Sequence, residues 1–360
     1  MITSPDSPEL DQLCARLRER AIELDRAPRW PAEQLQLCGE SGVYEWFIDP
    51  RWGGQGWNEE QVVRGYLALS AACLTTTFIL TQRTGACRRI EGCENESLKQ
   101  RLLPGLASGE FFGTVGISHL TTSRRHLAKP VLTAERVRGG FRLDGTAPWV
   151  TGGAAADVIV LAATRVADGE VTDEQLILAV STNLRGLRVA EPLPLVGVSA
   201  SATGPVHLDG VEVSDEWVIA GPMRHVMASG VGASTGGLET STLAIGLSKA
   251  AIEFLSSEAT RRADLQPATA ALRTEHERLL EDLLAASRGE THTSKELVRK
   301  RANSLVLRAT QAALAAAKGS GYVIGHPAGR WCREALFFLV WSCPQPVAAA
   351  NLCELAGIQD

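Results

Sequence analysis

The chain has 360 residues, more than one hydrophobic core usually organises, so two or three packed subdomains are expected. Its 45% hydrophobic and 21% charged residues are typical of a globular protein, and the formal net charge of -5 argues against nucleic acid as the main partner. The longest apolar runs, such as 335–341, are too short to span a bilayer, and the first residues lack the features of a signal peptide, so we predict a cytoplasmic protein.

The cysteines and histidines give no sign of a structural framework. The eight cysteines are scattered without a Cys-x-x-Cys pair, and the seven histidines show no metal-site spacing. We therefore predict reduced thiols and no metal.

The first 112 residues have a helical pattern. Helices are expected near residues 10–22, from Pro31, from Glu59, over 74–89, and from Asn95 until Pro104 stops the last one. The glycine-rich run 53–56 interrupts this series.

From Gly113 to about Ala220 the period changes to two, as in a small all-β domain. One strand is expected around 141–143, a turn at Asp144-Gly145, and a second strand from Trp149. Further strands are expected over 158–161, 176–180, 206–208 and 217–219.

Trp149 and Thr151 lie two residues apart, so an extended strand points both to one face. An aromatic wall beside a hydroxyl suits a planar heterocycle. The alternative is a core aromatic residue followed by a strand filler.

After Gly221 the pattern is helical again. Helices are expected over 238–255, 270–287, 294–317 and 330–341, with a turn at 318–322. The glycine-rich segment 230–237 suggests a phosphate loop, but it lacks a strand–turn–helix setting, so we interpret it as an entry into the next helix.

Four segments, in order, resemble motifs of the acyl-CoA dehydrogenase family. Segment 51–56 resembles its Tyr-Gly-Gly-x-Gly loop, 103–110 its Leu-Pro-x-Leu-Ala-x-Gly-Glu, 140–151 the strand that ends in Trp-Ile-Thr-Asn, and 206–213 its Phe-Asp-Asp-Val-x-Val-Pro. The resemblance implies an α+β multidomain fold. Its expected parts are an N-terminal helical domain (1–112), a middle β-barrel-like domain (113–222) and a C-terminal four-helix bundle (223–360).

The same resemblance implies FAD as cofactor. It places Trp149 and Thr151 against the isoalloxazine, and Ile117 and Ser118 in the segment that touches flavin and substrate, where this chain recovers only the Ser118 hydroxyl of the family motif. Arg262 remains from an Arg-x-x-Phe-Gly motif that reaches the FAD of a neighbouring subunit, without its Phe and Gly.

The catalytic base is the point of divergence. A dehydrogenase of this family needs a carboxylate to take the α-proton of the thioester. Ser342 stands where many members have that glutamate, and Gly236 where other relatives have it. Glu239, about one turn further on, is the candidate base; its alternative role is a first-turn glutamate favoured by the helix dipole.

Arg124 and Arg125 belong to a basic cluster that could meet the phosphate of CoA or of a carrier protein; such a run can also be a solvated loop.

The leading hypothesis is an FAD-dependent dehydrogenase of acyl-CoA or carrier-protein thioesters. We expect a homodimer or homotetramer that passes electrons to an acceptor protein or to oxygen. The alternatives are a flavin-dependent monooxygenase or oxidase, and a non-catalytic paralogue serving as a binding subunit.

Overall fold

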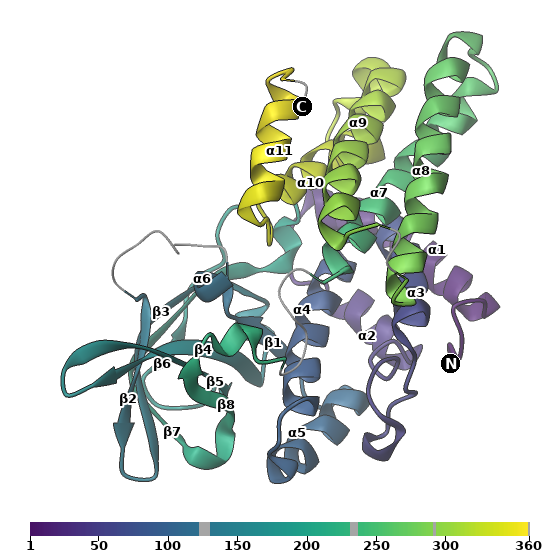
Figure 1. Cartoon of the computed structure of the whole chain (residues 1–360). Helices are drawn as coiled ribbons and strands as arrows, with labels where there is room; N and C mark the ends of the chain where they lie inside the picture. Colours follow the sequence, from purple (N-terminus) through teal and green to yellow (C-terminus); the bar gives the residue numbers. More distant parts are fainter. Residues whose placement is uncertain (122–129, 231–236, 291–292, 359–360) are drawn as a thin grey trace.

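The structure is a computed structural model that describes residues 1–121, 130–230, 237–290 and 293–358. A sheet domain lies beside the N-terminal helices, and the long C-terminal helices extend away from both (Figure 1). This is the predicted order of helical, sheet and helical parts. The domain boundaries at 112/113 and 222/223 stay predictions.

The N-terminal helices form where apolar residues recur at helical spacing. Leu10, Leu13 and Leu17 are all buried on one face of the first helix. Asn58 caps the third helix in a capping box with Gln61. The five helices are α1 (Pro8–Arg26), α2 (Ala32–Glu40), α3 (Glu59–Ala72), α4 (Leu74–Glu91) and α5 (Glu96–Ser108).

Pro104 does not stop α5, contrary to the prediction. The helix continues to Ser108 and ends at Gly109, whose φ of 81° is accessible to glycine without strain. Leu103 and Leu106, on either side of the proline, are fully buried. Packing of these side chains outweighs the single hydrogen bond that a proline removes from a helix.

The middle of the chain forms one eight-stranded sheet with the order β6-β7-β3-β2-β4-β5-β8, and β1 pairs with β4. Strands β1 and β2 run parallel to β4, and the other pairs are antiparallel. The strands are β1 (Gly113–Gly116), β2 (Leu132–Val137), β3 (Gly140–Thr151), β4 (Val158–Ala167), β5 (Glu170–Ser181), β6 (Leu187–Val189), β7 (Thr203–Ser214) and β8 (Val218–Arg224), and the short helix α6 (Ser118–Thr121) follows β1.

The predicted turn at Asp144-Gly145 is wrong, because β3 is a single strand. Gly145 pairs with Leu132 of β2 on one side and with Leu208 of β7 on the other. The irregularity is a bulge in β7, where the Gly210 amide donates to the Asp144 carboxylate at 2.7 Å. Pairing on both edges keeps the segment extended despite its turn-forming residues.

The apolar run of β4 is buried on both faces, as the sequence predicted. Val158, Val160 and Ala162 pack in one cluster with residues of α4 and α5. Ile159 and Leu161 pack on the opposite face, in a cluster formed by the sheet itself. The helices α4 and α5 therefore cover one face of the sheet.

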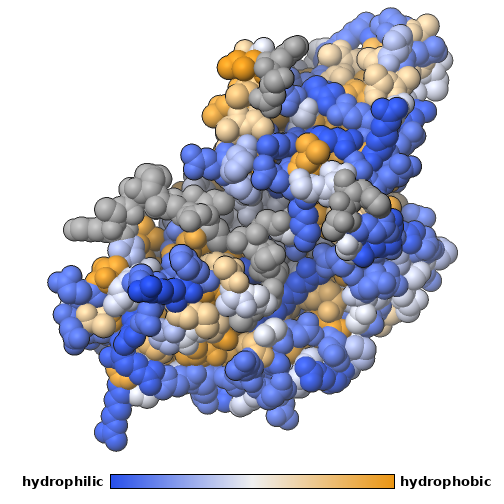
Figure 2. Space-filling view, in the orientation of Figure 1, coloured by the Kyte–Doolittle hydropathy of each residue, from blue (hydrophilic) through white to orange (hydrophobic). Residues whose placement is uncertain are grey.

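The C-terminal helices pack around α7, which contacts α3, α8 and α9. Their bounds are α7 (Glu239–Ala259), α8 (Gln266–Ser287), α9 (Lys295–Gly321), α10 (Pro327–Leu336) and α11 (Gln345–Leu355). A break inside α9 at Lys318, with φ 54° and ψ -148°, lies in the turn predicted at 318–322. Figure 2 shows apolar surface over α11, where Leu352 and Leu355 are exposed.

No helix in the described residues is long and apolar enough to cross a membrane. Those residues also hold no group of three or more His, Cys, Asp or Glu side chains arranged for a metal ion. All eight cysteines lie in the described part of the chain and are free thiols.

Candidate active site

Trp149 lies on β3 beside a bulge that turns it toward solvent. Ala147 and Val150 pair with Val206 and Gly204 of β7, so β3 has one extra residue between them. Trp149 is 43% exposed, whereas Thr151 is 4% exposed. The predicted pair thus consists of an open indole surface and a buried hydroxyl.

The Thr151 hydroxyl belongs to a buried chain of hydroxyl groups. It lies 2.9 Å from the Thr203 hydroxyl, which lies 2.9 Å from that of Ser201. The Thr114 hydroxyl of β1 donates to the Thr151 carbonyl at 2.8 Å. Each hydroxyl can both donate and accept, so this chain of hydrogen bonds fixes the Thr151 side chain.

The turn from β1 into α6 packs against β3 near Trp149. A side chain on Gly116 would meet Val150 at 2.9 Å, so only glycine allows this approach. Ile117 is buried, and Ser118 begins α6, which contacts β3. The structure therefore brings four of the predicted cofactor residues to one region. Arg124, Arg125 and Gly236 lie outside the described residues.

His119 follows Ser118 and is buried. Its Nε2 lies 2.8 Å from the Ala162 carbonyl, and burial lowers the pKa of its imidazole. The neutral ring, donating this hydrogen bond, is the form that the fold stabilises.

Acid is therefore expected to destabilise the fold through His119. The unfolded chain takes up the proton near pH 6.5, before the folded chain does, so stability is full above that pH and is lost as pH falls toward the lowered folded pKa. Urea unfolding at pH 7.5 and 5.5 measures this loss, which should shrink in His119→Gln. Part of the loss of stability in acid should remain in this variant, because the pKa of the buried His276 is also lowered. The exposed-residue control His225→Asn should keep the wild-type pH dependence; equal dependence in His119→Gln would contradict the assignment.

Glu239 begins α7 and is ion-paired. Its Oε1 accepts from Arg88 of α4 at 3.2 Å, and Arg88 also donates to Glu59 at 2.8 Å. These residues line a hollow of about 600 Å³, whose described lining includes neither Trp149 nor Ser342. Glu239 is thus a helix-start glutamate with a cation beside it, and a role as base requires Arg88 to release it.

Ser342 lies in a half-buried turn after α10, at φ 44°. Two buried residues of α9 hold this turn: Arg299 donates to the Trp341 carbonyl at 2.9 Å, and Asn303 to the Phe338 carbonyl at 3.0 Å. Burial lowers the pKa of Arg299 to about 10.

The ring of Trp341 also packs the Ser342 turn against the bundle. It stacks on Phe337 at 4.9 Å and meets Phe78 of α4 edge-on at 5.0 Å. The turn is rigidly anchored and carries no carboxylate of its own.

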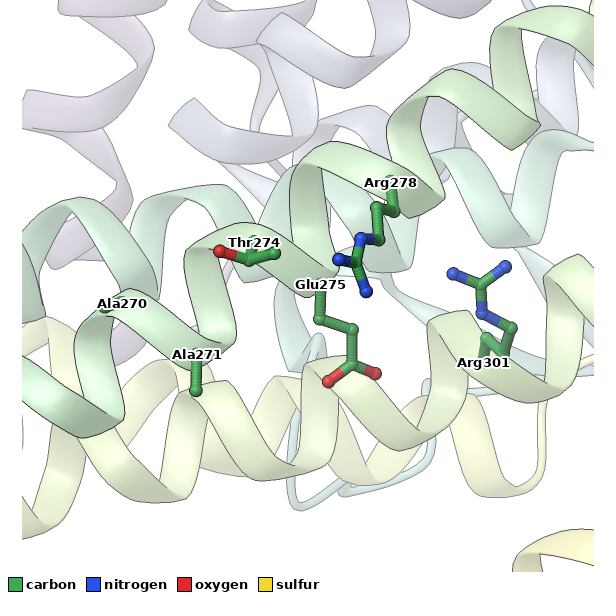
Figure 3. Close-up of a pocket in the computed structure, with 6 residues that line it drawn as sticks. All are labelled: Ala270, Ala271, Thr274, Glu275, Arg278 and Arg301. Carbon is green, nitrogen blue, oxygen red and sulfur yellow. The ribbon is translucent and has the colours of Figure 1, made fainter.

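Arg262 lies within the connection between α7 and α8. Its Nη1 donates to the Ala316 carbonyl at 2.6 Å, and it pairs with Glu258 and Asp264 at 3.9 and 3.5 Å. The guanidinium therefore binds its own chain. A second hollow, of about 610 Å³, lies between α8 and α9 (Figure 3). The one carboxylate among its described lining residues is that of Glu275, which Arg308 binds at 2.6 Å.

Sequence reasoning missed the residues that support the site. Arg88, Arg299 and the Ser201–Thr203 pair act on residues far away in the chain, and none stands in a motif. An arginine within a helical pattern was the available signal, and the sequence does not show which residue it binds.

The order of the helical, sheet and helical parts is that of acyl-CoA dehydrogenase structures. Residues 11–110 match the family model of the acyl-CoA dehydrogenase N-terminal domain. Glutaryl-CoA dehydrogenase of Desulfococcus multivorans is 25% identical over 93% of this chain and 90% of its own length. The N-terminal part of the chain thus matches the acyl-CoA dehydrogenase family, and nearly the whole chain is similar to a member of it.

Two further proteins are similar to this chain, one in sequence and one in structure. L-prolyl-[peptidyl-carrier protein] dehydrogenase of Pseudomonas fluorescens is 28% identical over 57% of this chain and 54% of its own. The solved glutaryl-coenzyme A dehydrogenase complex with glutaryl-CoA superposes with a TM-score of 0.82 at 21% identity, over 98% of this chain and 96% of that one, which shows the shared fold.

Proposed function

We propose that this chain is an FAD-dependent oxidoreductase that oxidises an acyl thioester, bound to CoA or to a carrier protein, at its α,β bond. The observation that carries the proposal is the similarity to a glutaryl-CoA dehydrogenase over 93% of the chain. The exposed indole of Trp149 beside the hydroxyl chain supports it, because a large aromatic surface on a strand suits a planar ring.

The residues on the sheet side fit a flavin ring. Trp149 would contact its face, Thr151 would orient a polar edge, and Ile117 with Ser118 would close the same side. On the helical side the fit is poorer, because Arg262 is already bonded to Ala316. A bound flavin supplies the acceptor for the hydride that leaves the β-carbon.

This chain must itself provide the base that takes the α-proton. The Ser342 hydroxyl has no carboxylate in its turn to activate it, so Glu239 is the proposed base despite its ion pair with Arg88. In the same proposal, Arg124 and Arg125 contact the phosphate of CoA or of the carrier protein. Electrons pass to an acceptor protein or to oxygen, and the chain forms a homodimer or homotetramer. The exposed apolar side of α11 supports self-association.

Spectroscopy tests the proposal. The purified protein with added FAD is expected to show a flavin absorption spectrum that one member of an anaerobic acyl-CoA panel bleaches. Bound flavin that no thioester reduces, but that NADH with a reductase and oxygen turns over, would indicate a monooxygenase or oxidase. Failure to bind FAD at any concentration would indicate a non-catalytic binding subunit.

Glu239→Gln is expected to abolish exchange of the thioester α-proton with deuterated solvent, because the amide cannot accept that proton. The matched control Glu59→Gln removes the other carboxylate that Arg88 binds and should leave exchange intact. NMR of the recovered thioester gives the exchange rate. Wild-type exchange in Glu239→Gln would remove this residue from the mechanism.

A further inference from the structure

A cavity of about 590 Å³ lies where the end of α1, the α3–α4 junction, the 196–200 loop and α10 meet. None of the residues proposed for the flavin or for the base is among its described lining. Its polar lining includes Asp25, Cys73, Thr75, Arg330, Arg333 and Glu334.

Two charged side chains of this cavity each have one polar atom without a hydrogen bond, although the other oxygen of Glu334 accepts from the Thr75 hydroxyl at 3.4 Å. Glu334 is 3% exposed and Arg330 is 7% exposed. Within the described residues, neither Oε2 of Glu334 nor Nε of Arg330 has a hydrogen-bond partner, and the two atoms are 3.6 Å apart, too far for a direct hydrogen bond. Buried polar atoms in folded proteins are nearly always satisfied, so this pair has capacity for a third group.

The net charge of the cavity depends on the protonation of Glu334. Asp25 of α1 binds Arg333 and accepts from the Gly325 amide at 3.2 Å, so these two charges cancel. Burial raises the pKa of the Glu334 carboxyl and also that of the Cys73 thiol beside it, which favours the uncharged form of both. With Glu334 protonated, Arg330 remains as the unbalanced charge; with Glu334 ionised, the two side chains form an ion pair at 3.6 Å.

Much of the rest of the wall is apolar. Leu24, Val198 and Leu314 contribute aliphatic surface, and Ile324 and Val196 lie exposed at its rim. The volume falls within the range of small-molecule sites, about 300–1,000 Å³. A ligand with one anionic end and an aliphatic body matches both the charged and the apolar part of the cavity wall.

We propose that this cavity is a second ligand site, which binds a small aliphatic carboxylic acid with its carboxylate between Arg330 and Glu334. The Arg330 Nε–H and, when it is protonated, the Glu334 carboxyl donate to the ligand oxygens, and the alkyl chain lies against Leu24 and Leu314. Charge-assisted hydrogen bonds of this kind are short and strong in a buried setting.

Isothermal titration calorimetry of the full-length protein tests the site with sodium acetate, butyrate, hexanoate and octanoate. One or more of these is expected to bind saturably with one site per chain, whereas hexylamine and hexanol do not. Affinity should fall as pH rises, because ionised Glu334 repels the carboxylate. The charged or titratable groups that line the cavity with Glu334 are Arg330, Arg333, Asp25, Cys73 and Cys332, with Tyr322 at the rim.

Variants locate the binding. Arg330→Met should weaken it at least about tenfold, as expected for a lost charge-assisted hydrogen bond. Glu334→Gln keeps a neutral donor and should bind within a few-fold of wild type, without the pH dependence. Should Arg330→Met fail to fold, Val196→Trp at the exposed rim blocks entry and should also abolish binding. Trp149→Ala on β3 is the control that leaves binding unchanged.

No saturable binding of any acid by the wild type overturns the proposal. So does equal affinity in Arg330→Met or Val196→Trp. Loss of binding in Trp149→Ala, or competition by FAD, would place the acid at the flavin region and also overturns it. Because the readout needs neither flavin nor turnover, its failure is separate from a failure of the proposed dehydrogenase activity.

Discussion

Replacing Trp149 with alanine is expected to weaken FAD binding by roughly tenfold to a hundredfold while leaving the fold intact. Stacking of a nucleobase on an aromatic side chain contributes about 1–3 kcal/mol, and a flavin ring offers a comparable face. Because Trp149 is 43% exposed, its loss removes little packing from the sheet. Flavin titration followed by quenching of flavin fluorescence, with thermal unfolding of the FAD-free protein alongside, measures both quantities.

The matched control is Val171→Ala, which removes exposed apolar surface from β5 of the same sheet. It should change neither flavin affinity nor stability. Unchanged flavin affinity in Trp149→Ala would sink the assignment of β3 as the flavin-facing strand. Lower stability without weaker binding would indicate that the indole is a packing residue.

Gly54→Ala is expected to lower the free energy of unfolding by about 3 kcal/mol or more, because there is no space for a methyl group. A Cβ on Gly54 would lie 1.9 Å from the Ile48 carbonyl oxygen, and Ile48 is fully buried. The loop cannot move away, since Gln55 and Gly56 donate to the Glu45 and Ile48 carbonyls at 2.8 and 2.9 Å. Urea unfolding followed by tryptophan fluorescence measures the loss.

Gly319→Ala is the control for this substitution. Nothing lies within 4 Å of the Cβ position there, so alanine should be neutral or slightly stabilising. If Gly54→Ala proved as stable as Gly319→Ala, the close approach of the loop to Ile48 would not exist in solution. The glycines of the 53–56 motif would then need another explanation than packing.

The motif 53–56 also shows what could be predicted from the sequence and what could not. It predicted an interruption between helices, and the structure adds the reason, which is contact with a carbonyl six residues earlier. Trp149 and Ser118 stood in motifs, and the elements that carry them, β3 and α6, contact one another. Glu239 was placed correctly at a helix start, but its partner Arg88 is 151 residues away and could not be inferred.

Local pattern by itself determined the helical, sheet and helical order and the buried β4, because side-chain periodicity records which faces are apolar. Tertiary structure decided what each local rule could not. Packing of Leu103 and Leu106 carried α5 through Pro104, and pairing on both edges kept β3 extended through Gly145. It also brought Glu334 and Cys73 into one cavity, 261 residues apart. Burial and charge pairing depend on neighbours in space, and those are set only when the chain folds.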